Sequence, residues 1–190
     1  RLSAIWSMET LCVTGHRPEG LPWKRQCDNT GRRGDYLAEL KSVLLFCINH
    51  GFRHFISGGA IGVDTDFAFA VLELKNKYPV TLEIAVPCPD QNKFWTKQEK
   101  ADYDEILARA DKVTLCSPYY TAYCMQKRNM YMVDNSDCVL CCYSGAKDGG
   151  TYNTVKYAER EGKKMILIDL SENGENRERK DVQFIYKVTL

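Results

Sequence analysis

Short β-branched runs alternate with helical stretches along nearly the whole chain, and this alternation most constrains the fold. A strand–helix unit repeated five times and followed by a further strand requires a mostly parallel sheet with right-handed crossovers and helices on both faces. The runs are almost continuously apolar, as is typical of strands covered on both sides. We expect strands at 9–14, 53–57, 80–86, 112–116, 137–143 and 164–169, and helices at 35–49, 61–77, 97–110, 122–134 and 151–161.

The length fits one domain of this kind. A chain of 190 residues buries about 70% of the surface that it exposes when unfolded, so it needs neither a disulfide nor a metal to hold a core. We expect a single α/β domain at residues 9–190, with a sheet of six or seven strands, a polar loop at 170–181 and a last strand at 182–188. Residues 1–8 are expected to lie outside the fold, as an added remnant or a disordered N-terminus.

The charge and the cysteine content limit which binding partners and which cellular compartment we expect for this protein. The 26 basic and 25 acidic residues give a net charge of +1, which argues against a protein held mainly to nucleic-acid phosphates. No apolar run reaches the length of about 18 residues that predicts a membrane helix, and the N-terminus has no secretory signal. Nine cysteines, an odd number, favour reduced thiols and a cytoplasmic location. We therefore expect neither a membrane nor a nucleic acid as partner.

A C-x-x-C spacing at Cys138 and Cys141 invites a metal or redox interpretation. Both thiols lie in a predicted strand, where residues three apart point to opposite faces, and Cys142 shares a face with Cys138 at a distance of about 13 Å. Neither Cys138 with Cys141 nor Cys138 with Cys142 can coordinate the same metal ion. No second C-x-x-C motif supplies further ligands. The sequence therefore predicts buried core thiols and no metal site.

Glycines, aromatic residues and polar residues gather where the predicted strands end. In an open parallel sheet, ligands bind beyond the carboxyl ends of the strands. The loops at the opposite edge are plainer, for example Tyr78-Pro79 and Glu161-Gly162. The five loops at the carboxyl edge, where we expect the ligand site, are 15–18, 58–64, 87–91, 117–120 and 144–154.

Two of these loops place glycines at the start of a predicted helix. At Gly58-Gly59 and at Gly149-Gly150-Thr151, missing Cβ atoms let a ligand approach the backbone, and the first amides of each helix can bind an anion. Asn153 and Thr154 follow the second group, which predicts a phosphate cradle although the lysine of a P-loop is absent. The alternative is packing: a tight turn after the second strand, with Gly62 easing helix-on-sheet contact, and a flexible turn after the fifth.

Charged and aromatic side chains complete the expected site. A carboxylate about 4 Å from a phosphate costs roughly 4 kcal/mol at an effective dielectric of about 20. Asp64 is therefore expected to meet sugar hydroxyls or a base amine, or simply to favour the positive end of its helix. Asp64 and Asp66 could also hold Mg²⁺ through a phosphate. Arg17 offers a planar fork for a phosphate or is a solvated loop residue. His16 can titrate near neutrality, but no acid–base partner is visible. Tyr119 is expected to stack on a nucleobase, unless it closes the core or a dimer face.

Five motifs, in order, resemble a known group of proteins. They are Thr14-Gly-His-Arg-Pro18, Phe55-Ile-Ser-Gly-Gly-Ala-Ile-Gly-Val-Asp64, Pro87-Cys-Pro-Asp-Gln91, Met125-Gln-Lys-Arg-Asn-Met-Tyr-Met-Val-Asp134 and Gly149-Gly-Thr-Tyr-Asn-Thr154. Through these motifs the chain resembles the YpsA-like branch of the SLOG superfamily, which unites the DNA-processing protein DprA with the cytokinin-activating LOG enzymes. The resemblance implies a Rossmann-like fold, a pocket for a nucleotide or nucleotide-derived ligand, and a homodimer.

The similarity to LOG enzymes bears on catalysis. Those enzymes hydrolyse the N-glycosidic bond of nucleoside monophosphates, and their motifs align Arg128 and Gly149-Gly150 with ligand-anchoring positions. The acidic residue that follows the glycines in LOG enzymes is absent, because this region reads Asn153-Thr-Val-Lys156. Glycosidic cleavage needs a carboxylate, so the role would fall to Asp64 or Asp66.

Three functions follow as hypotheses. The leading one is a module that binds a nucleotide, NAD or an ADP-ribose compound, as a sensor or processing protein with no further cofactor. The alternatives are a LOG-like glycosidic hydrolase, with Asp64 and Arg128 as catalytic candidates, and DprA-like binding of single-stranded nucleic acid. The candidate ligand-binding residues are Gly15, His16, Arg17, Ser57, Gly58, Gly59, Ala60, Gly62, Asp64, Tyr119, Arg128, Asn129, Gly149, Gly150, Thr151, Asn153 and Thr154.

Overall fold

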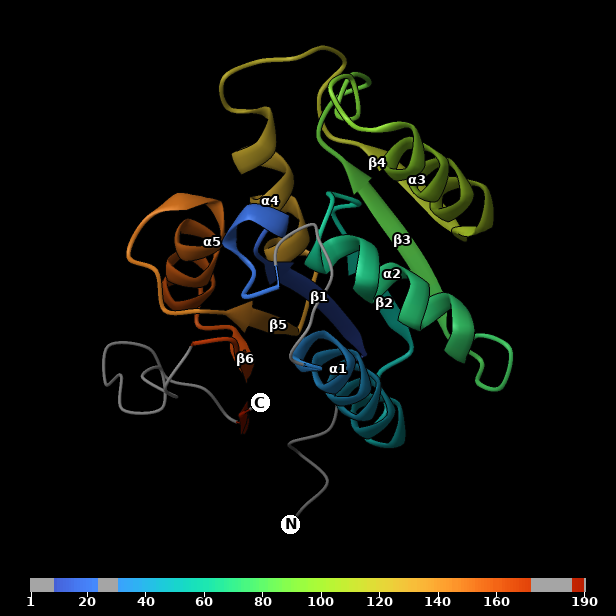
Figure 1. Ribbon diagram of the computed structural model, residues 1–190, viewed down its shortest axis with the longest axis vertical. Helices are drawn as coiled ribbons and strands as arrows, with labels where there is room; N and C mark the ends of the chain where they lie inside the picture. Colours follow the sequence, from blue (N-terminus) through green and yellow to red (C-terminus); the bar gives the residue numbers. More distant parts are fainter. Residues whose placement is uncertain (1–8, 24–30, 172–185, 190) are drawn as a thin grey trace.

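The computed structural model describes residues 9–23, 31–171 and 186–189, and these form one parallel sheet covered by helices (Figure 1). The α/β class and the Rossmann-like architecture are thereby confirmed. The strands of the sheet are β1 (Thr10–Gly15), β2 (His54–Ser57), β3 (Thr81–Val86), β4 (Lys112–Leu115), β5 (Cys138–Tyr143), β6 (Lys164–Asp169) and β7 (Tyr186–Thr189).

The strand order is β4-β3-β2-β1-β5-β6-β7, and every pairing is parallel. From β1 the chain builds outward through β2 and β3 to β4, and it then returns to the other side of β1 with β5. The direction of building therefore reverses between β1 and β5. Such a reversal opens a crevice at the carboxyl ends of the two strands.

Helices cover both faces of the sheet (Figure 1). One face packs against the first three helices, through a core that includes Leu40, Phe67 and Ile106, and the other packs against the last two, through Met132 and Val155. The helices of the described residues are α1 (Arg32–Asn49), α2 (Val63–Leu74), α3 (Lys97–Arg109), α4 (Cys124–Asp134) and α5 (Gly149–Arg160), with a 3-10 turn at Pro18–Gly20.

The cysteines of β5 divide between the two faces as predicted. Cys138 and Cys142 belong to the core under α1 and α2, whereas Cys141 belongs to the core under α4 and α5. All three thiols are buried and free, and burial raises their pKa. Within the described residues no group of three potential metal ligands occurs.

Helix boundaries differ from the predicted ones at glycines. Helix α2 begins at Val63, two residues later than expected, because Gly62 has φ 95° and does not continue a helix. Helix α5 begins at Gly149, two residues earlier than expected, after the extended residue Asp148. The shift matters because it adds both open glycines to the first turn of α5.

Some expectations fall partly outside the described residues. Residues 1–8 and most of the 170–181 loop lie beyond them, and the predicted last strand at 182–188 overlaps β7 only from residue 186 onward. Among the described helices, none combines the length and the apolar character that crossing a bilayer requires.

Candidate functional site

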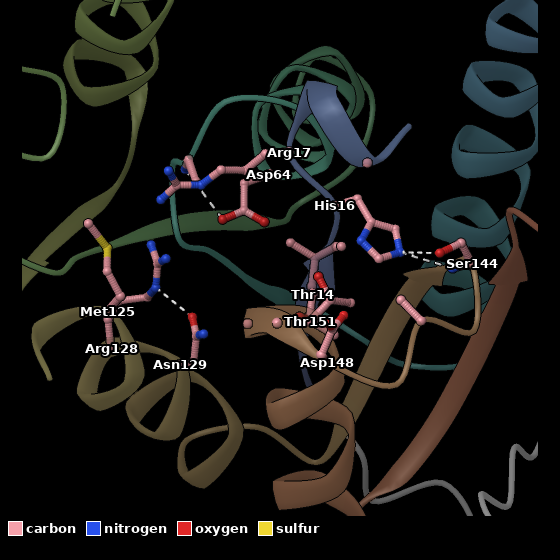
Figure 2. Close-up of a pocket in the computed structure, with 17 residues that line it drawn as sticks. Thr14, His16, Arg17, Asp64, Met125, Arg128, Asn129, Ser144, Asp148 and Thr151 are labelled. Atoms are coloured by element: carbon pink, nitrogen blue, oxygen red, sulfur yellow. Dashed lines mark hydrogen bonds between the residues drawn. The ribbon is translucent and has the colours of Figure 1, made fainter. Parts of the chain in front are cut away.

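A cavity of about 410 Å³ opens at the carboxyl edge of the sheet, where β1 and β5 lie side by side (Figure 2). Its volume falls in the range of about 300–1,000 Å³ that is usual for small-molecule sites. The wall combines the ends of β1 and β5 with the amino ends of two helices and a flank of α4. The lining residues are Val13, Thr14, Gly15, His16, Arg17, Gly20, Ala60, Asp64, Met125, Arg128, Asn129, Ser144, Ala146, Asp148, Gly149, Gly150 and Thr151.

The amino end of α5 forms one wall. The first N–H groups of a helix have no partner within the helix, so they are available to a ligand. A Cβ atom added at Gly149 or at Gly150 would meet nothing within 4 Å, so the backbone is open to approach from the cavity. The side chain of Asp148 makes no capping hydrogen bond, and it brings a carboxylate to this wall. The backbone is open here, and the phosphate cradle expected at this helix start stays a prediction.

The glycines after β2 are packed instead. A Cβ atom on Gly58 would lie 2.2 Å from Arg128 Nη1, and one on Gly59 would lie 3.0 Å from both Ile84 Cγ2 and Tyr103 Cε2. These two glycines, together with Ser57, are not among the residues that line the cavity. The packing alternative describes this turn, because its missing side chains make room for the protein's own groups.

Arg128 on α4 occupies the space that those glycines leave. It is only 4% exposed. Its Nη1 group donates to the carbonyl oxygen of Gly58 and, at 3.3 Å, to Gln91 Oε1, while Nε donates to Asn129 Oδ1 at 2.8 Å. Burial lowers the pKa of the guanidinium and Asp64 opposes that effect, yet an arginine stays charged in proteins. The Nη2 donors, which no described residue engages, remain for a group in the cavity.

Asp64, in the first turn of α2, lies beside Arg128 in the cavity wall, because both side chains reach the space next to Gly58 (Figure 2). Its Oδ2 atom accepts a hydrogen bond from the Ala60 amide at 3.3 Å. Burial raises the pKa of this carboxyl group, and the charges of Arg128 and Arg17 work in the opposite direction. Asp66, two residues further on, lines a separate cavity and pairs with Arg33 at 3.0 Å, so the two carboxylates do not share one site.

His16 has a partner that sequence reasoning missed. Its Nε2 atom accepts from the Ser144 amide at 3.0 Å and lies 2.8 Å from Ser144 Oγ, and its ring stacks on Tyr143 at 5.8 Å. Because the amide donates to Nε2, the proton of the neutral ring belongs on Nδ1. Burial lowers the pKa of His16. The pair spans the crevice between β1 and β5.

The remaining candidates lie around the cavity rather than in its wall. Asn153 and Thr154 line a second cavity, and Thr154 Oγ1 donates to the Gly150 carbonyl at 2.8 Å. Gly62 packs against the backbone at His16, and Tyr119, which is 68% exposed, is absent from the wall. Gln91, which accepts a hydrogen bond from Arg128, was not a named candidate, although the loop 87–91 was expected at this edge. The wall residues that were not named as candidates are Val13, Thr14, Gly20, Met125, Ser144, Ala146 and Asp148.

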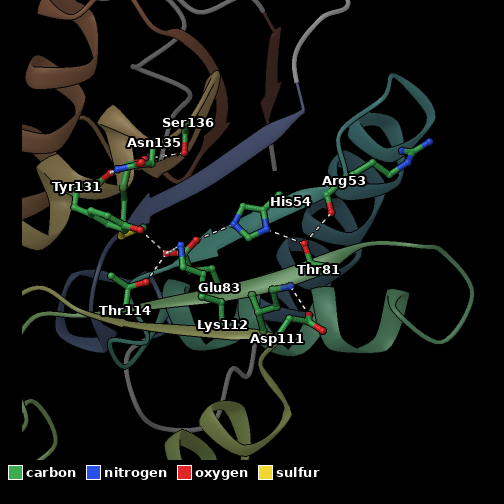
Figure 3. Close-up of polar contacts among 12 residues, drawn as sticks. Arg53, His54, Thr81, Glu83, Asp111, Lys112, Thr114, Tyr131, Asn135 and Ser136 are labelled. Carbon is green, nitrogen blue, oxygen red and sulfur yellow. Dashed lines mark hydrogen bonds and ion pairs between the residues drawn. The ribbon is translucent and has the colours of Figure 1, made fainter.

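The position of Arg128 depends on how α4 is fixed to the sheet (Figure 3). Tyr131, almost one turn after Arg128, donates a hydrogen bond to Glu83 Oε1 at 2.6 Å. Glu83 is buried, and it also accepts from His54 Nε2 at 2.8 Å and from Thr114 Oγ1 at 2.7 Å. One buried carboxylate therefore ties α4 to three neighbouring strands.

Curated relatives share most of the chain. The family model described as the YspA SLOG family matches residues 11–173. A UPF0398 protein of Bacillus pumilus (strain SAFR-032) is 30% identical over 156 residues, which cover 80% of this chain and 82% of that protein. The UPF0398 protein YpsA of Bacillus subtilis (strain 168) is 28% identical over 158 residues, which cover 80% of this chain and 86% of that protein.

Two solved structures of DNA processing protein A (DprA) have a similar fold. The Streptococcus pneumoniae protein superposes with a TM-score of 0.61 at 16% identity, over 95% of this chain and 59% of that chain. The Helicobacter pylori protein gives 0.58 at 16% identity, over 92% of this chain and 74% of that chain. Likeness at this identity concerns the fold alone. With the family model matched from the first strand to beyond the sixth, the chain belongs to the YpsA family of SLOG proteins.

Proposed function

We propose that the cavity binds a nucleotide-derived small molecule. The observation that carries the proposal is a buried guanidinium, that of Arg128, opposite the open amino end of α5 in a cavity of about 410 Å³. The remaining Nη2 donors of a buried arginine and the first amides of a helix both favour a phosphate. The cavity also lies at the reversal of strand order, where such ligands bind in parallel sheets.

The carboxylates of the cavity guide our proposal for where the sugar of the ligand lies. Asp64 and Asp148 would both repel a phosphate, so the proposal puts the phosphate at the open amides of Gly149 and Gly150, with Arg128 and Arg17 offsetting the two carboxylates. Asp64 then faces the sugar, whose hydroxyl groups can donate to it. Arg17 adds a second positive charge at the rim. The expected ligand is thus a phosphorylated ribose that carries a base, as in nucleotides, NAD and ADP-ribose compounds.

Thermal unfolding in the presence of nucleotides, NAD and ADP-ribose tests this proposal. A ligand at about 100 times its dissociation constant adds roughly 2.7 kcal/mol, which for this length raises the melting temperature by about 5–11 °C. Gly150→Asp places a carboxylate at the open helix end and is expected to abolish the shift, because it repels the phosphate. Gly150→Asn, of the same size but neutral, is the matched control for added bulk and should retain more of the shift than Gly150→Asp.

An absence of any shift across the panel would refute the proposal, as would equal shifts for the Asp and Asn variants. Chromatography of the same mixtures for free base and ribose phosphate tests whether binding leads to glycosidic hydrolysis. In that case Asp64→Asn should stop the release of base while the phosphate still binds.

Single-stranded nucleic acid is the second candidate ligand. The Helicobacter pylori DprA, which shares the fold, is described as binding single-stranded DNA. Tyr119, Tyr120 and Tyr123, all exposed, follow β4 at the same edge of the sheet and offer stacking surfaces for bases. Binding of an oligonucleotide that weakens steeply as salt rises would favour this candidate.

A further inference from the structure

A second cavity, of about 180 Å³, lies between α4 and α5. It shares Met125, Asn129 and Gly150 with the first cavity, so the two are neighbours across one boundary. Gly150 carries no side chain, and a Cβ there would meet nothing within 4 Å. No side chain of this residue therefore separates the two cavities at that point. The residues that line the second cavity are Ala122, Met125, Gln126, Asn129, Met130, Gly150, Asn153, Thr154 and Tyr157.

The two cavities differ in chemistry. The first has four charged side chains in its wall, whereas none of the described residues that line the second carries a charge. The second cavity instead combines two thioethers, Met125 and Met130, with the ring of Tyr157 and three side-chain amides. Thioethers make favourable contacts with aromatic rings, and amides supply both donors and acceptors for the edge of a heterocycle.

Tyr157 and Asn129 are held in place from outside the cavity. The Tyr157 hydroxyl donates to Asp134 Oδ1 at 2.8 Å, and Arg160 lies 5.0 Å from the centre of its ring. Asn129 Oδ1 accepts from Arg128 Nε, which leaves the Asn129 NH₂ group to donate. Asn129 therefore touches both the buried arginine of the first cavity and the uncharged interior of the second.

We propose that this α4–α5 cleft receives the base of the ligand while its phosphate stays in the first cavity. The inference rests on the proposed function and adds where the base lies. A cleft of about 180 Å³ is smaller than the usual small-molecule site of about 300 Å³ or more, so it suits one fragment, such as a ring, of a larger ligand. The base is thus held between two helices and not under Tyr119.

Filling the cleft tests the inference. Calorimetric titration compares AMP with ribose 5-phosphate, which lacks the base, on the wild type and on Asn153→Trp. Asn153 is exposed and lines only the second of the two cavities, so its indole should occupy the cleft and spare the first cavity. In Asn153→Trp the affinity for AMP should fall about tenfold or more, because a stacked base is lost. The affinity for ribose 5-phosphate should stay unchanged.

Gln98→Trp, an exposed substitution on α3, is the control for an added indole and should alter neither affinity. Gln126→Trp, which fills the cleft from α4, repeats the test if Asn153→Trp does not fold. Equal affinity of wild type and variants for AMP, or a parallel loss of both ligands, would overturn the inference and leave the proposed function standing. Failure of the wild type to bind either ligand or any other member of the nucleotide panel would instead overturn the proposed function itself.

Discussion

Glycine serves opposite purposes at the two helix starts near the cavity. At Gly58 the missing Cβ makes room for charged groups of the protein, since it would lie 2.2 Å from Arg128 Nη1 and 2.6 Å from Asp64 Oδ2. At Gly150 the same absence leaves open space beside a helix end. The surroundings, and not the residue type, decide what each glycine does.

Alanine substitutions separate these two purposes. Gly58→Ala forces Arg128 out of its buried position, so the free energy of unfolding should fall by about 1–3 kcal/mol, as is usual for overpacking, and the nucleotide-induced shift should disappear. Gly150→Ala adds a methyl group in open space and should change stability by no more than about 1 kcal/mol. Urea denaturation measures both, and similar losses for the two variants would contradict this account.

Sequence reasoning found most residues of the cavity but not their pairings. Gly149 and Gly150 were predictable because a helix start has a local signature, whereas Arg128 was found through the resemblance to LOG motifs. The contact of His16 with Ser144 joins positions 128 residues apart, and it exists only because β1 and β5 are neighbours. A pairing of that kind follows from strand order, which the sequence leaves open.

At the scale of elements, α4 depends on a carboxylate buried beneath it. The pKa of Glu83 is lowered to about 2. Burial alone would raise this pKa, but hydrogen bonds from His54, Tyr131 and Thr114 outweigh the effect of burial. The charge of Lys112 acts in the same direction as these hydrogen bonds. The folded state therefore binds the proton less readily than the unfolded state between about pH 2 and 4.5. The stabilisation is complete above pH 4.5 and is lost as the pH falls through that range.

Replacing Glu83 with Gln tests this link. At pH 7 the variant should lose about 1–3 kcal/mol of unfolding free energy, because buried donors lose a charged acceptor. The difference from the wild type should shrink as the pH drops from 4.5 toward 2. Urea denaturation followed by circular dichroism at several pH values measures this, and a difference that stays constant with pH would refute the role of the charge.

Element positions were predictable from the sequence, whereas element ends were not. Apolar periodicity located each helix and strand, since it reflects which face is buried. The ends of α2 and α5 depend on the backbone angles of Gly62 and Gly149, whose φ values are 95° and 85°. Gly62 lies against the backbone of His16, whereas Gly149 has open space beside it, so the residue type alone does not show on which side of a helix boundary a glycine lies.

At the scale of the whole molecule, thiols of the described residues occur in both cores, and Cys88 lies beside Cys124. Of the eight cysteines in the described residues, seven are buried and Cys116 is partly exposed. Burial raises the pKa of Cys12 and of Cys47 to about 12, so few of these thiols ionise at neutral pH. Only the ionised thiolate form of a cysteine is a strong nucleophile, so the native fold should protect these buried thiols from thiol reagents.

Thiol titration checks that distribution. In a Cys27→Ser background, which removes the cysteine outside the described residues, an aromatic disulfide reagent should label at most one thiol quickly, namely Cys116. The other seven should react only when denaturant unfolds the chain. Rapid labelling of several thiols without denaturant would mean that one of the two cores is open.

The two walls of the cavity come from distant parts of the chain, since the His16–Ser144 contact spans 128 positions. A ribosome adds about 5–20 residues per second, so roughly 6–26 s pass between the emergence of these two residues during translation. Throughout that interval the nascent polypeptide has only one wall of the cavity. If the proposed ligand binds here, it can stabilise the chain only after both walls have emerged, so its concentration would act on the lifetime of the folded protein and not on the early part of its synthesis.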